Sequence, residues 1–237
     1  MTRGLHTAGI DVVLLDIEGT TTPVSFVYDV LFPYARARLP AWFAARSISD
    51  PDVREIVESL GEEREGDPGA RVAWTIDSLV SRLLSYMDED RKSRALKIVQ
   101  GKIWEEGYAS GQLRGEVYPD VPPALQRWTA DGRPVGIFSS GSVLAQKLLF
   151  AHSTAGDLTP LLRWHFDTAV GPKVDTSSYT RIAESVNASP SSILFISDVA
   201  NELKAANEAG LRTLLCVRPP AAAPSSAFAV IHTFDDV

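Results

Sequence analysis

The chain has 237 residues, with 23 Lys and Arg against 30 Asp and Glu, so its formal net charge at pH 7 is -7. This acidic balance excludes the domain-wide basic field that holds nucleic acid. The apolar run near the N-terminus is too short for a bilayer span or a signal-peptide core. We therefore expect a monomeric, cytoplasmic protein that acts on a small molecule, without nucleic-acid or membrane partners. The single cysteine, Cys216, excludes a disulfide within the chain.

The first predicted element is a buried strand that ends at two acidic residues. The run Val12-Val13-Leu14-Leu15 is continuously apolar, as is typical of a strand covered on both faces of a parallel sheet. Asp16 and Glu18 follow it, and Gly19 supplies a turn. Residues at this edge of an open α/β sheet line the crevice where ligands bind, so both carboxylates are expected to face a site. The alternative is a capped strand end followed by a Thr-rich turn.

A helical insert is predicted after this strand. Long helical periodicities run over Val72–Met87 and Arg91–Tyr108, and the polar segment Gly61–Ala70 is typical of a loop. No convincing strand lies between residues 24 and 115. We therefore expect residues 24–115 to form an all-helical cap domain, inserted into an α/β core that consists of residues 1–23 and 116–237.

From about Pro119 onward, apolar runs alternate with amphipathic stretches. This rhythm is typical of βαβ units and predicts a Rossmann-like parallel sheet. The expected strands are Val135–Phe138, Phe166–Val170, Ile193–Ile196 and Leu211–Val217, and Arg218–Ser226 is expected to be a loop.

Two of these strand ends carry groups that can bind an anion. Ser139, Ser140 and Gly141 precede a helical stretch, where free backbone amides attract negative charge. An ordinary helix N-cap is the alternative, although it needs only one Ser. Lys173 follows Gly171-Pro172 and could neutralise a phosphoryl oxygen. Taken singly, it could equally be a surface lysine.

A third strand end is acidic. Asp198 follows the run that ends at Ile196, and Asn201 and Glu202 come three and four residues later on one helix face. Asp198 could instead only cap that helix. The coincidence of four strand ends with suitable side chains favours a functional site.

Together these groups meet the needs of phosphoryl transfer, which requires an in-line nucleophile, cations around the transferring oxygens and a proton for the leaving group. Asp16 is the expected nucleophile. One Mg²⁺ ion is expected on Asp16, the backbone carbonyl of Glu18 and Asp198. Further roles are expected of other residues: Glu202 or Asn201 for orienting metal-bound waters, and Thr20, Ser139 and Lys173 for holding phosphoryl oxygens.

This residue set, with a helical insert after the first strand, resembles the haloacid dehalogenase superfamily of phosphatases. More specifically, the segments 16–34 (DIEGTTTPVSFVYDVLFPY), 139–150 (SSGSVLAQKLLF) and 166–173 resemble the enolase-phosphatase family of methionine salvage. Most phosphatases of the superfamily carry Asp where Glu18 stands, so Glu at this position separates the subfamily from generic sugar-phosphate phosphatases.

The resemblance implies two reactions on 5-(methylthio)-2,3-dioxopentyl phosphate, enolisation and then dephosphorylation to the acireductone, with one shared Mg²⁺. It implies that Ser139, Ser140 and Lys173 contact the substrate and that Asp16, Glu18 and Lys173 are catalytic. The enolisation base is open, with Glu18 as the first candidate. Phe26, Phe32 and Tyr34 are candidates for contacts with the methylthio group, or else belong to the core of the cap or to cap-to-core packing.

The sequence is also compatible with other functions. One is a phosphatase of the same superfamily without enolase activity. A dehalogenase would use Asp16 without needing Asp198. A silent phosphate-binding or signalling module is the alternative from another class, although a receiver-type module does not carry its phosphorylated Asp on the first strand.

Overall fold

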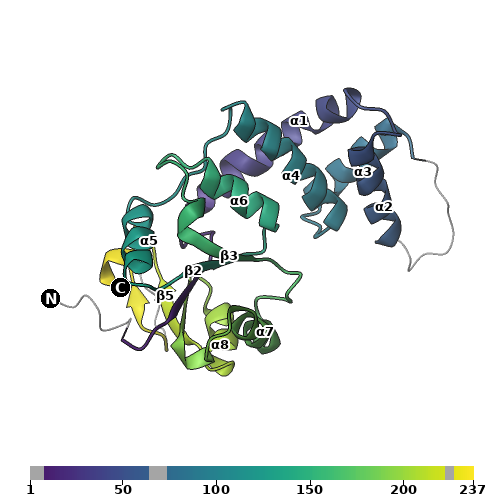
Figure 1. Ribbon diagram of the computed structural model, residues 1–237. Coiled ribbons are helices and arrows are strands. Elements are labelled where there is room, and N and C mark those ends of the chain that lie inside the picture. The colour runs from purple at the N-terminus through teal and green to yellow at the C-terminus, as the bar shows by residue number, and fades with distance from the viewer. Residues whose placement is uncertain (1–7, 64–73, 222–226) are drawn as a thin grey trace. The chain divides into compact units, whose positions relative to one another are not determined.

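The computed structural model describes residues 8–63, 74–221 and 227–237. The chain divides into two compact units, Met1–Phe26 with Arg114–Val237, and Val27–Leu113. We call the first the α/β unit and the second the helical unit, and Figure 1 shows the elements of each. Within the described ranges, no helix is both long enough and apolar enough to cross a membrane.

The α/β unit is built on a six-stranded sheet in the order β3-β2-β1-β4-β5-β6. Every neighbouring pair is parallel. The strands are β1 (Val12–Leu15), β2 (Val135–Phe138), β3 (Leu162–Phe166), β4 (Ile193–Ser197), β5 (Arg212–Cys216) and β6 (Val230–Ile231). All four residues of β1 are buried, as expected for a central strand covered on both faces. The predicted α/β class with a parallel sheet is confirmed.

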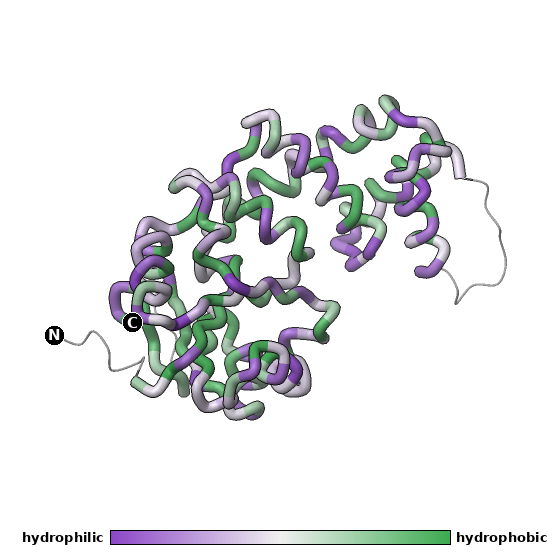
Figure 2. Tube along the Cα trace, in the orientation of Figure 1, coloured by the Kyte–Doolittle hydropathy of each residue, from purple (hydrophilic) through white to green (hydrophobic). Residues whose placement is uncertain are grey.

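Helices cover both faces of this sheet. They are α5 (Val121–Ala130), α6 (Val143–Ala151), α7 (Thr176–Val186) and α8 (Ala200–Glu208), with short 3₁₀ turns at Thr159–Leu161, Pro190–Ser192 and Phe234–Asp236. In Figure 1, α7 and α8 lie together on one side of the strands, and α5 and α6 lie on the other. Figure 2 shows hydrophobic residues along the strands and mixed character along the helices. On the α7 and α8 side, Leu14, Phe138, Tyr179 and Phe195 belong to one buried cluster.

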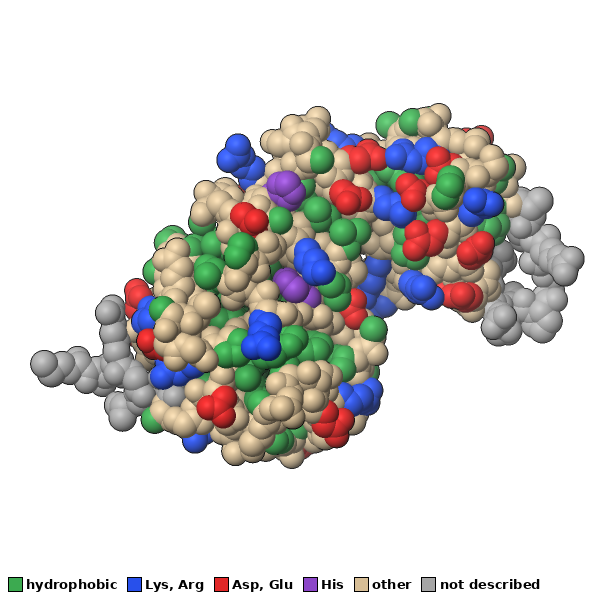
Figure 3. All heavy atoms as spheres, viewed as in Figure 1, with side chains coloured by type: hydrophobic (Ala, Val, Ile, Leu, Met, Phe, Trp, Pro, Cys, Tyr) green, Lys and Arg blue, Asp and Glu red, His purple; other side chains and the backbone are tan. Residues whose placement is uncertain are grey.

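The helical unit contains no strand in its described residues. A π-helix at Phe26–Leu31 leads into α1 (Phe32–Ala44), which is followed by α2 (Pro51–Glu62), α3 (Ile76–Asp88) and α4 (Arg94–Ala109). Local capping sets where three of these helices begin, because the side chains of Asp50, Thr75 and Ser93 each accept a bond from an orphan amide of the first turn. Figure 3 shows charged side chains of both signs interspersed over the surface of this unit.

The structure corrects three local predictions. β3 is Leu162–Phe166 and not Phe166–Val170; as an edge strand with one partner it tolerates the polar Arg163 and His165, which broke the apolar pattern. The helix predicted from Val72 begins at Ile76, because Thr75 and Ser78 form a capping box. Of the predicted loop Gly61–Ala70, Gly61 belongs to α2, and residues 64–70 lie outside the described residues.

Candidate active site

Asp16 lies at the carboxyl end of the central strand. Leu15 pairs with Ile137 on β2 and with Ile196 on β4, so the next residues of all three strands meet at one edge of the sheet. Asp16 is only 2% exposed. Its Oδ1 accepts from the amide of Ile17 at 2.7 Å, and the hydroxyl of Ser197 lies 3.1 Å from its Oδ2. Both carboxylate oxygens are therefore held, which fixes the rotamer of the side chain.

The loop after Asp16 closes on itself. The carbonyl of Ile17 accepts from the amides of Thr20, Thr21 and Thr22 at 2.9–3.2 Å. Gly19 adopts a φ of +68°, a conformation that side chains with a Cβ rarely adopt. The hydroxyls of Thr20 and Thr22 are buried and have no hydrogen-bond partner in the structure. Because a buried hydroxyl usually has a partner, the Thr20 hydroxyl is suited to a ligand atom.

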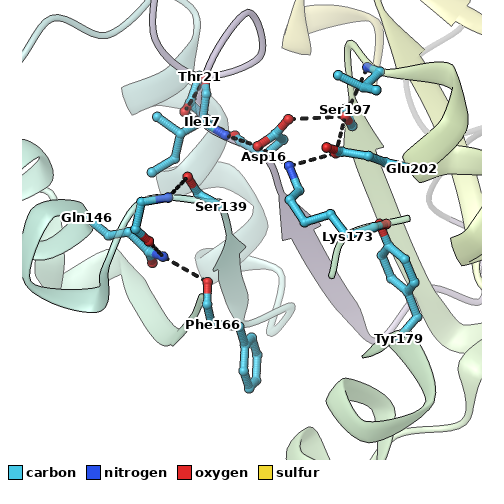
Figure 4. A network of polar contacts seen from close by, with 12 residues as sticks. Asp16, Ile17, Thr21, Ser139, Gln146, Phe166, Lys173, Tyr179, Ser197 and Glu202 are labelled. Carbon is cyan, nitrogen blue, oxygen red and sulfur yellow. Dashed lines mark hydrogen bonds and ion pairs between the residues drawn. The ribbon is translucent and has the colours of Figure 1, made fainter. Parts of the chain in front are cut away.

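Lys173 supplies the positive charge beside Asp16. Its Nζ lies 2.5 Å from Asp16 Oδ1 and 2.6 Å from Glu202 Oε2, and its side chain is 5% exposed. Burial alone would lower the pKa of this ammonium, but the two carboxylates outweigh burial and raise the pKa above its ordinary value. Lys173 is therefore charged at neutral pH. Figure 4 shows Lys173 pointing toward Asp16 and Glu202.

A clamped loop brings Lys173 to this place. The residue stands seven positions after the end of β3, in the connection to α7. Gly171 turns the chain with a φ of +134°. The Ser178 hydroxyl then donates to the Pro172 carbonyl and the Tyr179 hydroxyl to the Lys173 carbonyl, each at 2.7 Å. Both donors belong to α7, so the position of the lysine backbone is fixed by a helix packed on the sheet.

The site holds more negative than positive charge. Burial, followed by the charge of Asp16, raises the pKa of Glu18 to about 7 and that of Asp198 to about 6. The same two causes raise the pKa of Glu202, although Lys173 and Ser197 oppose them. One ammonium cannot compensate four neighbouring carboxylates, so a further cation would stabilise their charged forms.

A hard divalent cation suits this arrangement in part. The described residues contain no group of three or more His, Cys, Asp or Glu side chains that could hold a metal ion. The predicted ligands are two carboxylates and one backbone carbonyl, and Mg²⁺ typically binds few protein groups and keeps several waters. Asp198 approaches the backbone of Gly19 so closely that a Cβ there would lie 2.6 Å from its Cγ. The Asp198 carboxylate therefore lies beside the loop that carries the Glu18 carbonyl.

The loop after β2 carries the predicted anion-binding hydroxyls. Ser139 is 1% exposed, and its Oγ accepts from the Gly141 amide at 3.1 Å. Its own amide donates to the Phe166 carbonyl at 3.2 Å. Ser140 is exposed. The hydroxyl of Ser142 caps α6 by accepting from Ala145, so the capping role belongs to Ser142 and leaves Ser139 for another task.

The structure brings most of the predicted site residues to one edge of the sheet. Asn201 differs, because its side chain is exposed on α8, whereas Glu202 points to Lys173. Ser197 was missed by sequence reasoning: its hydroxyl lies 3.1 Å from Asp16 and 3.0 Å from Glu202 and accepts from the Val199 amide. The available signal was a polar residue at the end of an otherwise apolar strand.

The three aromatic candidates have packing roles. Phe26 is 2% exposed. Phe32 packs edge to face against Tyr28 and in a tilted arrangement against Trp104 inside the helical unit, and the Tyr34 hydroxyl donates to Gln112 at 3.2 Å. These contacts support the alternative in which the aromatic residues stabilise the cap.

Comparisons with known proteins agree with this geometry. Residues 10–210 match the family of haloacid dehalogenase-like hydrolases. The enolase-phosphatase E1 of Citrobacter koseri is 49% identical over 228 residues, which cover 96% of each chain. That of Synechococcus elongatus is 46% identical over 233 residues, covering 96% of this chain and 98% of the relative. The crystal structure of the UTR4 protein from Saccharomyces cerevisiae superposes with a TM-score of 0.79 at 33% identity, covering 94% of this chain and 97% of that one.

Proposed function

The chain belongs to the haloacid dehalogenase-like hydrolases and, within them, to the enolase-phosphatase E1 family, and from this membership we propose that it converts 5-(methylthio)-2,3-dioxopentyl phosphate to the acireductone and phosphate in methionine salvage. The observation that carries the proposal is the buried pair of Asp16 and Lys173, 2.5 Å apart at the carboxyl edge of the sheet. It supports the proposal because a carboxylate beside a fixed cation, at the edge of the sheet where ligands bind in open α/β folds, suits attack on an anionic substrate.

In the dephosphorylation, Asp16 attacks phosphorus in line with the ester oxygen. The P–O bond to the substrate breaks, and an acyl phosphate forms on Asp16. The departing oxygen takes a proton, and the candidate acid is Glu18, which lies two residues after Asp16 in the sequence. Water then cleaves the acyl phosphate with Glu18 as base, which releases orthophosphate and restores Asp16. Lys173 stays charged throughout and stabilises the transferring oxygens, while Thr20 and Ser139 donate to them.

In the enolisation, a base removes a carbon-bound proton next to a carbonyl, the C–H electron pair forms the C=C bond, and the protonated base returns the proton to the carbonyl oxygen. Glu18 is our candidate base, because burial and Asp16 raise its pKa to about 7, which suits proton exchange near neutral pH. Asp16, the Glu18 carbonyl and Asp198 would hold one Mg²⁺. When bound, this ion supplies Lewis-acid stabilisation of negative charge on substrate oxygens. We further propose that residues 24–115 act as the cap, that the enzyme is a monomer and that it works in the cytoplasm.

The test supplies the diketo phosphate with Mg²⁺ and follows enol absorbance and phosphate release together. We expect both signals from the unmodified enzyme and neither phosphate release nor acyl phosphate from Asp16→Asn. A matched control is Asp11→Asn, since Asp11 is exposed just before the start of the same strand; it should behave as the unmodified chain. Phosphate without an enol signal would instead support a phosphatase lacking enolase activity. Near-normal turnover of Asp16→Asn would eliminate the covalent mechanism.

A further inference from the structure

A buried glutamine joins two loops of the proposed active site. Gln146 on α6 is 1% exposed. Its side-chain amide donates to the Gly141 carbonyl at 3.0 Å and to the Phe166 carbonyl at 2.8 Å. Figure 4 shows this side chain beside Ser139 and Phe166. Gly141 belongs to the loop that carries Ser139 and Ser140, and Phe166 ends the strand before the loop that carries Lys173. One side chain therefore ties the two substrate-binding loops together.

Backbone contacts converge on the same point. The Phe166 carbonyl also accepts from the Ser139 amide, and the next residue, Asp167, accepts from the Val143 amide at 3.3 Å. The Phe166 carbonyl thus accepts two hydrogen bonds, one from the Ser139 amide and one from the Gln146 side chain, and so uses both of its lone pairs. Removing the Gln146 amide leaves the half-buried Gly141 carbonyl without its side-chain donor, which favours a shift of the loop.

Two backbone carbonyls set the orientation of the Gln146 amide, and His165 contacts its opposite end. Both backbone carbonyls can only accept, so the NH₂ of Gln146 must face them and its Oε1 must face the opposite way. There it meets His165 Nδ1 at 3.3 Å, and an amide oxygen requires that Nδ1 carry the proton. Burial and then the charge of Lys147 lower the pKa of His165 to about 4, so the ring is neutral near pH 7. The contact therefore selects the Nδ1–H tautomer.

We propose that Gln146 and His165 are positioning residues, which together hold the Ser139–Gly141 loop in its phosphate-binding geometry. The proposal rests on the proposed function, because it takes Ser139 as a donor to the substrate phosphate. The Ser139 Oγ accepts from the Gly141 amide and keeps its own proton for a ligand. A shift of Gly141 would redirect that hydroxyl, so the pair sets substrate affinity without touching substrate.

Four variants test this role. Gln146→Met removes the donors at similar length, and Gln146→Glu places an acceptor against two carbonyl oxygens. His165→Leu removes the Nδ1–H donor, whereas His165→Asn keeps a donor at a similar position. We expect the KM for the diketo phosphate and the inhibition constant of orthophosphate to rise together, by about tenfold in Gln146→Met and further in Gln146→Glu, as expected for the loss of buried hydrogen bonds. The kcat should change by less than about threefold, since the reacting groups are untouched.

The histidine pair distinguishes positioning from packing. His165→Leu should raise both constants by about threefold to tenfold, and His165→Asn should restore values near those of the unmodified enzyme. Because His165 is neutral over the assay range, the pH profile of kcat/KM should keep its shape in both. A lowered melting temperature with unchanged KM and phosphate affinity in Gln146→Met would overturn the proposal, as would equal effects of His165→Leu and His165→Asn. If the enzyme does not turn over the diketo phosphate at all, calorimetric titration with orthophosphate and Mg²⁺ tests the positioning role separately.

Discussion

Gly19 offers a sharp test of the acidic site, because it combines a left-handed backbone conformation with a closely packed neighbour. Its φ is +68°, and a Cβ at this position would lie 2.6 Å from Asp198 Cγ and closer still to one carboxylate oxygen. In Gly19→Ala the nearer carboxylate oxygen must withdraw by about 0.9 Å to reach a 3.0 Å contact. The left-handed conformation alone costs a residue with a Cβ about 1–2 kcal/mol. For a chain of this size that corresponds to a melting temperature lower by roughly 2–8 °C.

The displacement of Asp198 should affect catalysis more than stability. Misplacing a catalytic group by about 1 Å can cost about a hundredfold in rate, so we expect kcat/KM to fall by about tenfold to a hundredfold and the Mg²⁺ concentration for half-maximal activity to rise. Gly132→Ala is the matched control: Gly132 has a φ of +76° and nothing within 4 Å of its Cβ position. It should lose similar stability and keep full activity. If both variants have the same activity, the proposed role of Asp198 beside Gly19 is wrong.

Three further predictions concern other parts of the chain. Glu18→Asp should leave Mg²⁺ affinity unchanged and lower turnover by about tenfold or more, as expected for a displaced acid–base group; unchanged kinetics in both steps would refute that role. Asp120→Asn should cost about 3 kcal/mol of unfolding free energy at pH 7, because it breaks the buried pair with Arg218, 2.6 Å long. Burial would raise the pKa of Asp120, but bonds from Arg218 and the Phe234 amide lower it. The difference between the variant and the unmodified chain in urea titrations should therefore be full above the unfolded pKa of about 4 and decrease progressively as the pH falls from there through the lowered pKa of the folded protein; a difference that is as large at pH 2 as at pH 7 would contradict the assignment. Gly107→Ala should destabilise the helical unit, because its Cβ would lie 2.6 Å from the Tyr34 hydroxyl, whereas Gly61→Ala, with nothing within 4 Å, should stabilise α2 by about 0.5–1 kcal/mol; denaturation midpoints that move in the same direction would refute this.

The sequence predicted the central strands well because burial on both faces leaves a continuous apolar signal. Val12–Leu15, Val135–Phe138 and Ile193–Ser197 are buried throughout, and each prediction matched its strand within one residue. The edge strand β3 was misplaced by four residues, since burial is weak there and polar residues alternate with Trp164 and Phe166. Strand β6 was missed, because two residues carry too little pattern to be seen.

The sequence predicted a role for Lys173 but not the path of the chain that brings it to Asp16. Its residue type and its place after Gly171-Pro172 suggested a phosphate ligand beside a strand end. The strand in fact ends at Phe166, and a clamped turn brings the lysine back to Asp16. That path depends on the hydroxyls of Ser178 and Tyr179. The sequence predicts these two residues only as part of an ordinary helix. Tertiary hydrogen bonds of this kind leave no periodic signal in the chain.

The structure gives Glu202 contacts that the sequence did not predict. The sequence predicted that Glu202 or Asn201 orients metal-bound waters. In the structure its Oε2 contacts Lys173 at 2.6 Å and Ser197 at 3.0 Å, and both of these groups also contact Asp16. Glu202 therefore holds two of the groups that contact Asp16, the proposed nucleophile. One ammonium, that of Lys173, contacts two buried carboxylates, so truncating Glu202 would free Lys173 to move and leave Asp16 less constrained. Glu202 therefore contributes to the orientation of the Asp16 carboxylate and only indirectly to its charge.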